Sequence, residues 1–174
     1  LRKAEALNYP ADALAPAIAR ALLAQGDVRK VTKDYGKVEI ADPQGRADLA
    51  TTLATAYLSQ GDRDNAKTAA DAALTAVPGY PRALTVRAQL LAIDRDLDGA
   101  LKALNEALAA APNLVDATML KAQILIAQDK RDEAIKLLAD AAAAASGAPT
   151  AMQLRSALVP LLIASGDVAR AEAE

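Results

Sequence analysis

The sequence predicts an all-α fold, a right-handed superhelical solenoid of antiparallel helix pairs. Alanines recur at a step of 34 residues, as in Ala66, Ala100 and Ala134, and a proline closes successive units at Pro78 and Pro112. Between these points the apolar residues follow a helical spacing. A fixed period of this length with small residues at fixed offsets is typical of stacked helix pairs, and about four and a half such pairs fit the chain.

The amino-acid composition limits how the core can be packed and which catalytic or metal-binding sites the protein can have. Apolar residues make up 53% of the 174 residues but aromatic residues only 2%, so we expect closely packed helices with alanine at their contacts. Histidine and cysteine are absent, which excludes disulfides, the usual zinc sites and nucleophiles that depend on these residues. No convergent pair of carboxylates is evident either. The sequence therefore predicts no enzyme, no cofactor and no metal site.

Charge and hydropathy also argue against nucleic acid as a partner and against a membrane span. The 20 basic and 22 acidic residues give a net charge of -2, without the basic stripe that a nucleic-acid-binding protein needs. No run of about 18 apolar residues predicts a membrane span. Residues 1–8 read as the end of a helix from an upstream repeat, so we expect the chain to be an excerpt of a longer protein. Missing targeting signals then carry little information.

The first repeat, residues 12–45, is expected to be atypical. The preceding helix ends at Pro10, and Asp12 is expected to cap a new helix that runs to the turn at Gly26. Its partner begins at Val28. Because glycine interrupts this partner and apolar residues then alternate with charges, we predict a short helix followed by an extended segment that ends at Pro43.

Three regular repeats follow, at residues 47–80, 81–114 and 115–148, and residues 152–174 form a truncated one. Gly61 is expected to adopt the left-handed conformation that ends a helix, and Asp62 to cap the next helix. The predicted helix pairs are 47–59 with 63–76, 81–93 with 97–110, 115–127 with 131–145, and 152–164 with a helix from 168 onward.

The repeat pattern resembles the tetratricopeptide repeat (TPR). In the unit from Ala47, the residues that carry the resemblance are Leu53, Ala54, Tyr57, Ala66, Ala73 and Pro78. The resemblance implies that small residues let the helix axes approach closely, and that the first helix of each pair lines a concave groove for a protein or peptide partner.

At finer grain the sequence is similar to bacterial TPR lipoproteins of the PEP-CTERM and exosortase system. The segments that carry this similarity are residues 21–26, 56–61, 120–122 and 127–134. This resemblance implies a role in exopolysaccharide production or protein sorting. It also implies a location in the periplasm or at the outer membrane, anchored by an upstream lipid, with a cytoplasmic location as the alternative.

By register, twelve residues of the first helices are expected to face the groove. They recur at i, i+3 or i+4, and i+7, which is one face of a helix. Their hydroxyl, amide and charged groups could bind an extended peptide or a glycan. The alternative is a solvated helix face on a structural spacer that has no ligand. The twelve are Arg20, Asp48, Thr51, Thr55, Arg82, Thr85, Gln89, Asp116, Met119, Gln123, Gln153 and Ser156.

Other candidate sites have simpler interpretations. A clamp for a terminal carboxylate is not expected, because the groove has Arg20 and Arg82 but no larger basic cluster, and Asp48 and Asp116 would oppose binding of a carboxylate. The acids at Asp94, Asp96 and Asp98 lie in a turn too short for a calcium loop, so we expect them to serve the start of the next helix. Tyr35, Tyr57 and Tyr80 are expected to pack between repeats.

Overall fold

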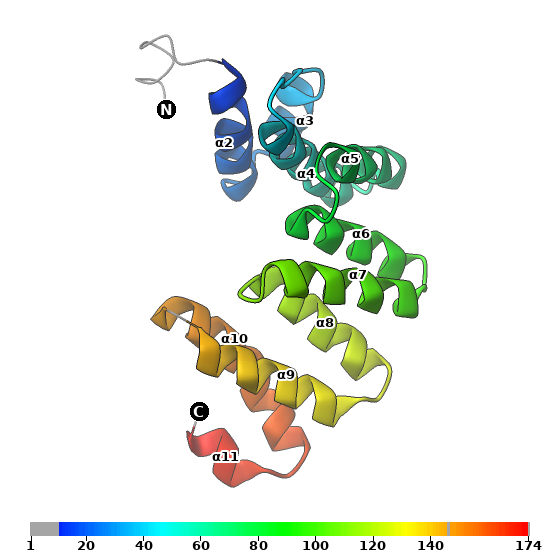
Figure 1. Ribbon diagram of the computed structural model, residues 1–174. Helices are drawn as coiled ribbons and strands as arrows, with labels where there is room; N and C mark the ends of the chain where they lie inside the picture. The colour runs from blue at the N-terminus through cyan, green and yellow to red at the C-terminus, as the bar shows by residue number, and fades with distance from the viewer. Residues whose placement is uncertain (1–10, 146, 174) are drawn as a thin grey trace. The chain divides into compact units, whose positions relative to one another are not determined.

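The computed structural model describes residues 11–145 and 147–173, and within these ranges it contains ten helices and no strand (Figure 1). The helix predicted within residues 1–8 lies outside the described residues. The helices are α2 (Ala11–Ala24), α3 (Val28–Tyr35), α4 (Pro43–Ser59), α5 (Arg63–Ala76), α6 (Pro81–Ile93), α7 (Leu97–Ala110), α8 (Val115–Ala127), α9 (Arg131–Ala144), α10 (Ala148–Ala164) and α11 (Val168–Ala173).

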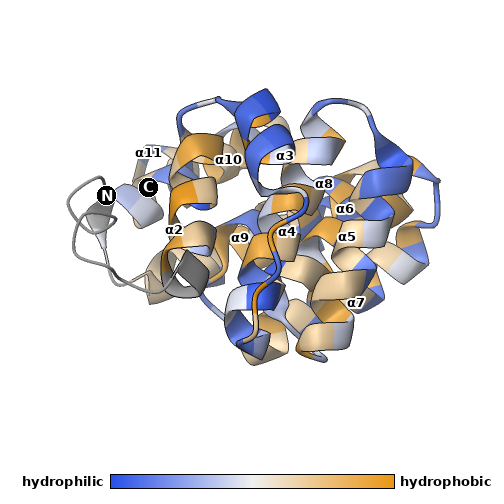
Figure 2. Ribbon diagram, turned by 90° about the horizontal axis from the view of Figure 1, so that it is seen from above, coloured by the Kyte–Doolittle hydropathy of each residue, from blue (hydrophilic) through white to orange (hydrophobic). Residues whose placement is uncertain are grey.

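The contacts divide the chain into two compact units, residues 1–90 and residues 91–174. The first unit contains α2 to α5 and most of α6, and the second contains α7 to α11. In both units, polar and apolar residues share the same helices (Figure 2), as expected when one face of a helix packs and the other meets water. We call α2, α4, α6, α8 and α10 the first helices and their partners the second helices.

Alanines build the helix contacts of the first unit. Ala54 of α4 and Ala66 of α5 are both 0% exposed, and they pack with Ala70, Val86 and Leu90. A methyl side chain lets two helix axes approach closely, whereas a larger side chain at such a contact would overpack it. The predicted role of these alanines in the core is therefore confirmed.

The core of the second unit uses larger side chains. Leu138 of α9 packs with Leu154, Leu158 and Leu162 of α10, and each of these leucines is at most 2% exposed. Fully burying a leucine contributes about 1.5–3 kcal/mol relative to leaving it in water. The leucine contact between α9 and α10 therefore stabilises this unit.

The starts of the second helices α5 and α7 follow the predicted capping chemistry. Gly61 has φ = 77°, which is the left-handed conformation, and Asp62 accepts a hydrogen bond from the Asn65 backbone N–H at 3.2 Å. In the next repeat, Asp96 accepts a hydrogen bond from the Gly99 backbone N–H at 2.9 Å. The prediction that the turn acids serve the start of a helix is thus confirmed for Asp96.

Three predicted helix starts were wrong. Helix α4 begins at Pro43 rather than Ala47, because proline is favourable in the first helical turn and Asp42 caps the helix by accepting from the Gly45 N–H at 2.7 Å. Helix α10 begins at Ala148 rather than Met152, again with a proline in its first turn. Helix α2 already includes Asp12, so this residue does not precede the helix as a cap.

The irregular second helix of the first repeat is confirmed. Helix α3 has only eight residues, and the chain is not helical again until Pro43. Val31, at the position where the other repeats have alanine, is 0% exposed. Ile40, in the segment after α3, is 5% exposed and joins the same core cluster. This non-helical segment is therefore held against the first unit by its apolar side chain.

Candidate binding surface

Asp48 of α4 joins two other predicted groove residues into one network. Its Oδ2 accepts a hydrogen bond from Nη1 of Arg20 on α2 at 2.9 Å, and its Oδ1 accepts from Nη1 of Arg82 on α6 at 2.6 Å. The Tyr80 hydroxyl donates to the same Oδ1 at 3.4 Å. We call these four residues the Asp48 network. Three consecutive first helices therefore meet at a single carboxylate.

The repeat period relates two members of this network. Asp48 and Arg82 are 34 residues apart, so they occupy equivalent positions on adjacent first helices. Tyr80 comes directly before α6, and its ring packs against the alanine cluster of Ala47, Ala50, Ala73 and Ala83. The predicted packing role of Tyr80 is confirmed, and the aromatic ring also brings the hydroxyl group to Asp48.

The network is only partly shielded from water. The side chain of Asp48 is 15% exposed, that of Arg82 34% and that of Arg20 51%. Burial raises the pKa of the Tyr80 phenol above its ordinary value, the charge of Asp48 raises it further, and Arg82 opposes the shift. Two guanidinium groups thus share one carboxylate, which leaves the network with an excess of positive charge.

The threonines of the predicted groove bond to their own helices. The Thr51 hydroxyl donates to the Ala47 carbonyl at 2.7 Å, the Thr55 hydroxyl to the Thr51 carbonyl at 3.0 Å, and the Thr85 hydroxyl to the Pro81 carbonyl at 3.0 Å. Thr51 and Thr85 are 1% and 5% exposed. These two threonines therefore lie within the packing of the first unit, while Thr55 is half-buried. Their part in binding stays a prediction.

The other predicted groove residues lie at or near the surface. Gln89 is half-buried in the first unit. In the second unit Met119 is half-buried against the leucine core, and the remaining four are exposed. The Ser156 hydroxyl donates to the Gln153 carbonyl at 2.7 Å. The four exposed residues are Asp116, Gln123, Gln153 and Ser156. No network like that of Asp48 is recorded among these residues over residues 91–145 and 147–173.

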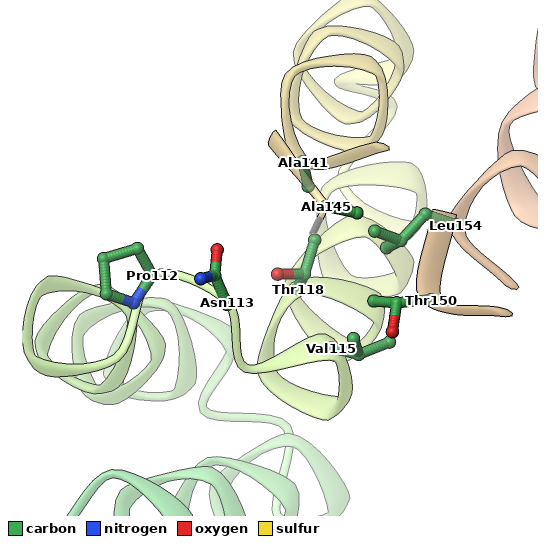
Figure 3. Close-up of a pocket in the computed structure, with 8 residues that line it drawn as sticks. All are labelled: Pro112, Asn113, Val115, Thr118, Ala141, Ala145, Thr150 and Leu154. Atoms are coloured by element: carbon green, nitrogen blue, oxygen red, sulfur yellow. The ribbon is translucent and has the colours of Figure 1, made fainter. Parts of the chain in front are cut away.

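A small pocket in the second unit was not predicted. It has a volume of about 150 Å³, and the side chains of Thr118, Ala145, Thr150 and Leu154 converge on it (Figure 3). Thr118 donates its hydroxyl to the Leu114 carbonyl at 3.2 Å. The complete lining is Pro112, Asn113, Val115, Thr118, Ala141, Ala145, Thr150 and Leu154.

The pocket lies beside an irregular step in the repeats, because Thr150 and Leu154 of its lining belong to α10. Ala127 and Ala164 both end first helices, yet the step between them is three residues longer than the usual 34. The extra residues lie at the start of α10, which has 17 residues where α8 has 13. The sequence analysis did not predict this cavity, because a cavity depends on how the surrounding side chains pack.

The acidic turn has a structural explanation. Besides the cap by Asp96, Asp98 accepts a hydrogen bond from Nε2 of Gln128 at 3.4 Å. Within residues 11–145 and 147–173, no group of three or more acidic side chains could hold a metal ion. None of the helices described is both long and apolar enough to cross a bilayer.

Comparisons with known proteins agree with this architecture. Residues 51–115 and residues 91–158 each match a family model described as "Tetratricopeptide repeat". A search of curated proteins finds no match. Similar solved structures include Pseudomonas aeruginosa PilF, which is 16% identical with a TM-score of 0.72, and the alignment covers 93% of this chain and 72% of PilF.

Two further structures are similar over most of their length. A thermophilic TPR protein of Thermus thermophilus is 19% identical with a TM-score of 0.68, covering 93% of this chain and 87% of that protein. The protein MamA is 17% identical with a TM-score of 0.62, covering 86% of this chain and 85% of MamA. At these identities the likeness concerns the fold alone.

Proposed function

Since the chain belongs to the tetratricopeptide repeat family, whose members bind protein partners and are typically non-catalytic, we propose that it is a protein-binding scaffold. The first helices supply the binding face. The observation that carries this proposal is the Asp48 network, in which Asp48 bonds to Arg20 of α2 and Arg82 of α6 at once. In the first unit, three consecutive first helices therefore present polar side chains on a common face.

We also propose a narrower role in bacterial exopolysaccharide production or PEP-CTERM protein sorting. This role rests on the resemblance carried by residues 21–26, 56–61, 120–122 and 127–134. It places the protein in the periplasm or at the outer membrane, where an upstream lipid would anchor it. A search for partners accordingly starts with a cell-envelope extract of the source bacterium.

The scaffold proposal is tested by removing polar groups from the first helices. We expect a variant with Thr55→Ala, Gln89→Ala and Gln123→Ala to recover less of the partner from the envelope extract than the unchanged protein. A matched control carries Lys67→Ala, Lys102→Ala and Lys136→Ala, which are exposed positions on the second helices α5, α7 and α9. The control should recover the partner fully.

Two results would contradict the proposal. Unchanged recovery of every partner by the first-helix variant would favour a structural spacer without a ligand. Equal losses in both variants would show that binding depends on the first helices no more than on the second. Circular dichroism of each variant establishes that a loss of binding is not a loss of folding.

A further inference from the structure

The two arginines of the Asp48 network keep most of their hydrogen-bond donors for other groups. A guanidinium carries five N–H donors, and Arg20 and Arg82 each give only one of them to Asp48. Both oxygens of Asp48 are already engaged, one by Arg20 and the other by Arg82 and Tyr80. A further anion would therefore meet free N–H groups without displacing Asp48.

The helices that carry the network have an excess of positive charge. Helices α2, α4 and α6 contain four arginines, two aspartates, and no lysine or glutamate. The whole chain, by contrast, has a net charge of -2. Within the Asp48 network two guanidinium groups face one carboxylate, so an acidic group of a partner is attracted to this point of the first unit. The four arginines are Arg20, Arg46, Arg82 and Arg87.

Asp48 holds the two guanidinium groups in place before any ligand arrives. It connects arginines from two different helices through distances of 2.9 and 2.6 Å, and its own side chain is only 15% exposed. A guanidinium that is already held loses less conformational freedom when it binds a carboxylate. Asp48 is thus a positioning residue, and Arg20 and Arg82 are the groups that would touch the ligand.

We propose that Arg20 and Arg82 form a site for the side-chain carboxylate of an aspartate or glutamate in an extended partner segment. The proposal rests on the scaffold function above and specifies its ligand. Charge-assisted hydrogen bonds from a guanidinium to a carboxylate are about twice as strong as bonds between neutral groups. A segment with a regular series of acidic residues would thereby be held at the first unit.

The test uses two synthetic peptides with amidated C-termini. One has repeated Glu-Ala-Ser units, and its twin has glutamine in place of glutamate. In NMR spectra of the unchanged protein, we expect the Nε–H signals of Arg20 and Arg82 to shift with the glutamate peptide but not with its twin. The signals of Arg46 and Arg87, exposed arginines on α4 and α6, should stay in place. Equal shifts of all four signals, or none, would overturn the proposal.

Two double variants provide a matched comparison. Replacing both Arg20 and Arg82 with alanine should weaken binding of the glutamate peptide about tenfold, the effect of losing about 1.4 kcal/mol. Replacing both Arg46 and Arg87 with alanine removes the same charge from outside the network and should leave the affinity nearly unchanged. Equal weakening by the two variants would show a general attraction of charge rather than a site.

A third peptide separates two kinds of carboxylate. It has the glutamine sequence with a free C-terminus, so its only carboxylate is terminal. We expect no shift of the Arg20 and Arg82 signals with this peptide. A shift here, without one for the amidated glutamate peptide, would overturn the assignment to a side chain and indicate capture of a chain end.

Failure of this proposal can be told apart from failure of the scaffold function. If envelope partners are recovered and replacing Arg20 and Arg82 does not reduce their recovery, the acidic site is wrong but the scaffold function stands. If the polar groups of the first helices prove irrelevant to recovery while the glutamate peptide still shifts Arg20 and Arg82, the site exists and the scaffold function is wrong.

Discussion

Arg95 has a backbone conformation that glycine adopts at the equivalent turn of other repeats. Its φ is 65°, and Asp129 in the next repeat has φ = 61°, whereas Gly26, Gly61 and Gly166 have values from 77° to 83°. The Cβ atom of a non-glycine residue makes this conformation unfavourable by about 1–2 kcal/mol. The turn geometry is thus kept by the packing of the helices even where the residue opposes it.

We predict that Arg95→Gly raises the free energy of unfolding by about 0.5–1 kcal/mol, because relief of the strain exceeds the larger entropy of glycine in the unfolded chain. Asp129→Gly should change the free energy of unfolding less, since aspartate tolerates the left-handed region better than arginine. Urea unfolding of the two variants gives the comparison. If Arg95→Gly instead lowered the free energy of unfolding, the arginine side chain would stabilise the fold by more than its backbone strain destabilises it.

The Asp48 network should make stability depend on pH in the alkaline range. The pKa of Tyr80 is raised above 10.0, chiefly by burial and then by Asp48, so the folded protein holds this proton more tightly than the unfolded chain. The contribution of Tyr80 is complete below pH 10.0 and is lost as the pH rises through the folded-state pKa.

We therefore predict that the free energy of unfolding falls more steeply above pH 10.0 in the unchanged protein than in Tyr80→Phe. Phenylalanine keeps the ring that packs on the alanine cluster but has no proton to lose. Urea unfolding at a series of pH values measures both curves. If the difference between the two proteins were constant across the whole series, Tyr80 would not be the group responsible.

The sequence revealed the members of the network but not their contacts. Arg20, Asp48 and Arg82 were all predicted to face the groove, Tyr80 was predicted only to pack, and Asp48 was expected to oppose binding of a terminal carboxylate. That Asp48 bonds both of them depends on the distances between three helices, which the repeat period alone does not fix. The buried positions of Thr51 and Thr85 were missed for a similar reason, since register gives a helix face but not how closely the neighbouring helix covers it.

Helices within the regular repeats were predicted more accurately than those at irregular steps. The observed bounds of α5, α6, α7 and α8 agree with the predicted ones. The starts of α4 and α10 were missed because the 34-residue register omits the extra first turn that these two helices carry. Proline was also interpreted at Pro43 as the end of an extended segment, although it equally suits the first turn of a helix.

A buried alanine should be the most sensitive position on a second helix. Ala100 of α7 is 0% exposed, as are its equivalents Ala66 and Ala134. We predict that Ala100→Leu lowers the free energy of unfolding by about 1–3 kcal/mol, because the added atoms force neighbouring helices apart. Ala109→Leu on the same helix is the control, since Ala109 is exposed and leucine is nearly as good a helix former as alanine.

Thermal or urea unfolding of these two variants measures the change in the free energy of unfolding that each substitution causes. The control should lie within about 0.5 kcal/mol of the unchanged protein, as surface substitutions usually do. A loss of similar size in both variants would mean that α7 responds to leucine itself. No loss for Ala100→Leu would mean that the helix contacts are loose enough to accept larger side chains, contrary to the small-residue rule of the repeat.

At the scale of the whole molecule, each repeat depends on its neighbours in sequence. Contacts between helices join elements that are close along the chain, such as α4 with α5, α8 with α9, and α9 with α10. In an array of this kind, stability is approximately a sum of repeat terms and nearest-neighbour terms. A local defect should therefore lower stability locally, unlike a defect in a globular domain with one shared core.

Leu138 allows this property to be tested. It is 1% exposed and lies in the core cluster formed by α8, α9 and α10, so Leu138→Ala should cost about 2–5 kcal/mol there. We predict that amide hydrogen exchange in this variant speeds up in α8, α9 and α10 and is unchanged in α4 and α5. Leu137→Ala, at a half-buried neighbouring position, should produce a smaller change in the same helices. Equal acceleration in α4 and α5 would mean that the two units unfold as one cooperative body, and the nearest-neighbour description would then fail for this chain.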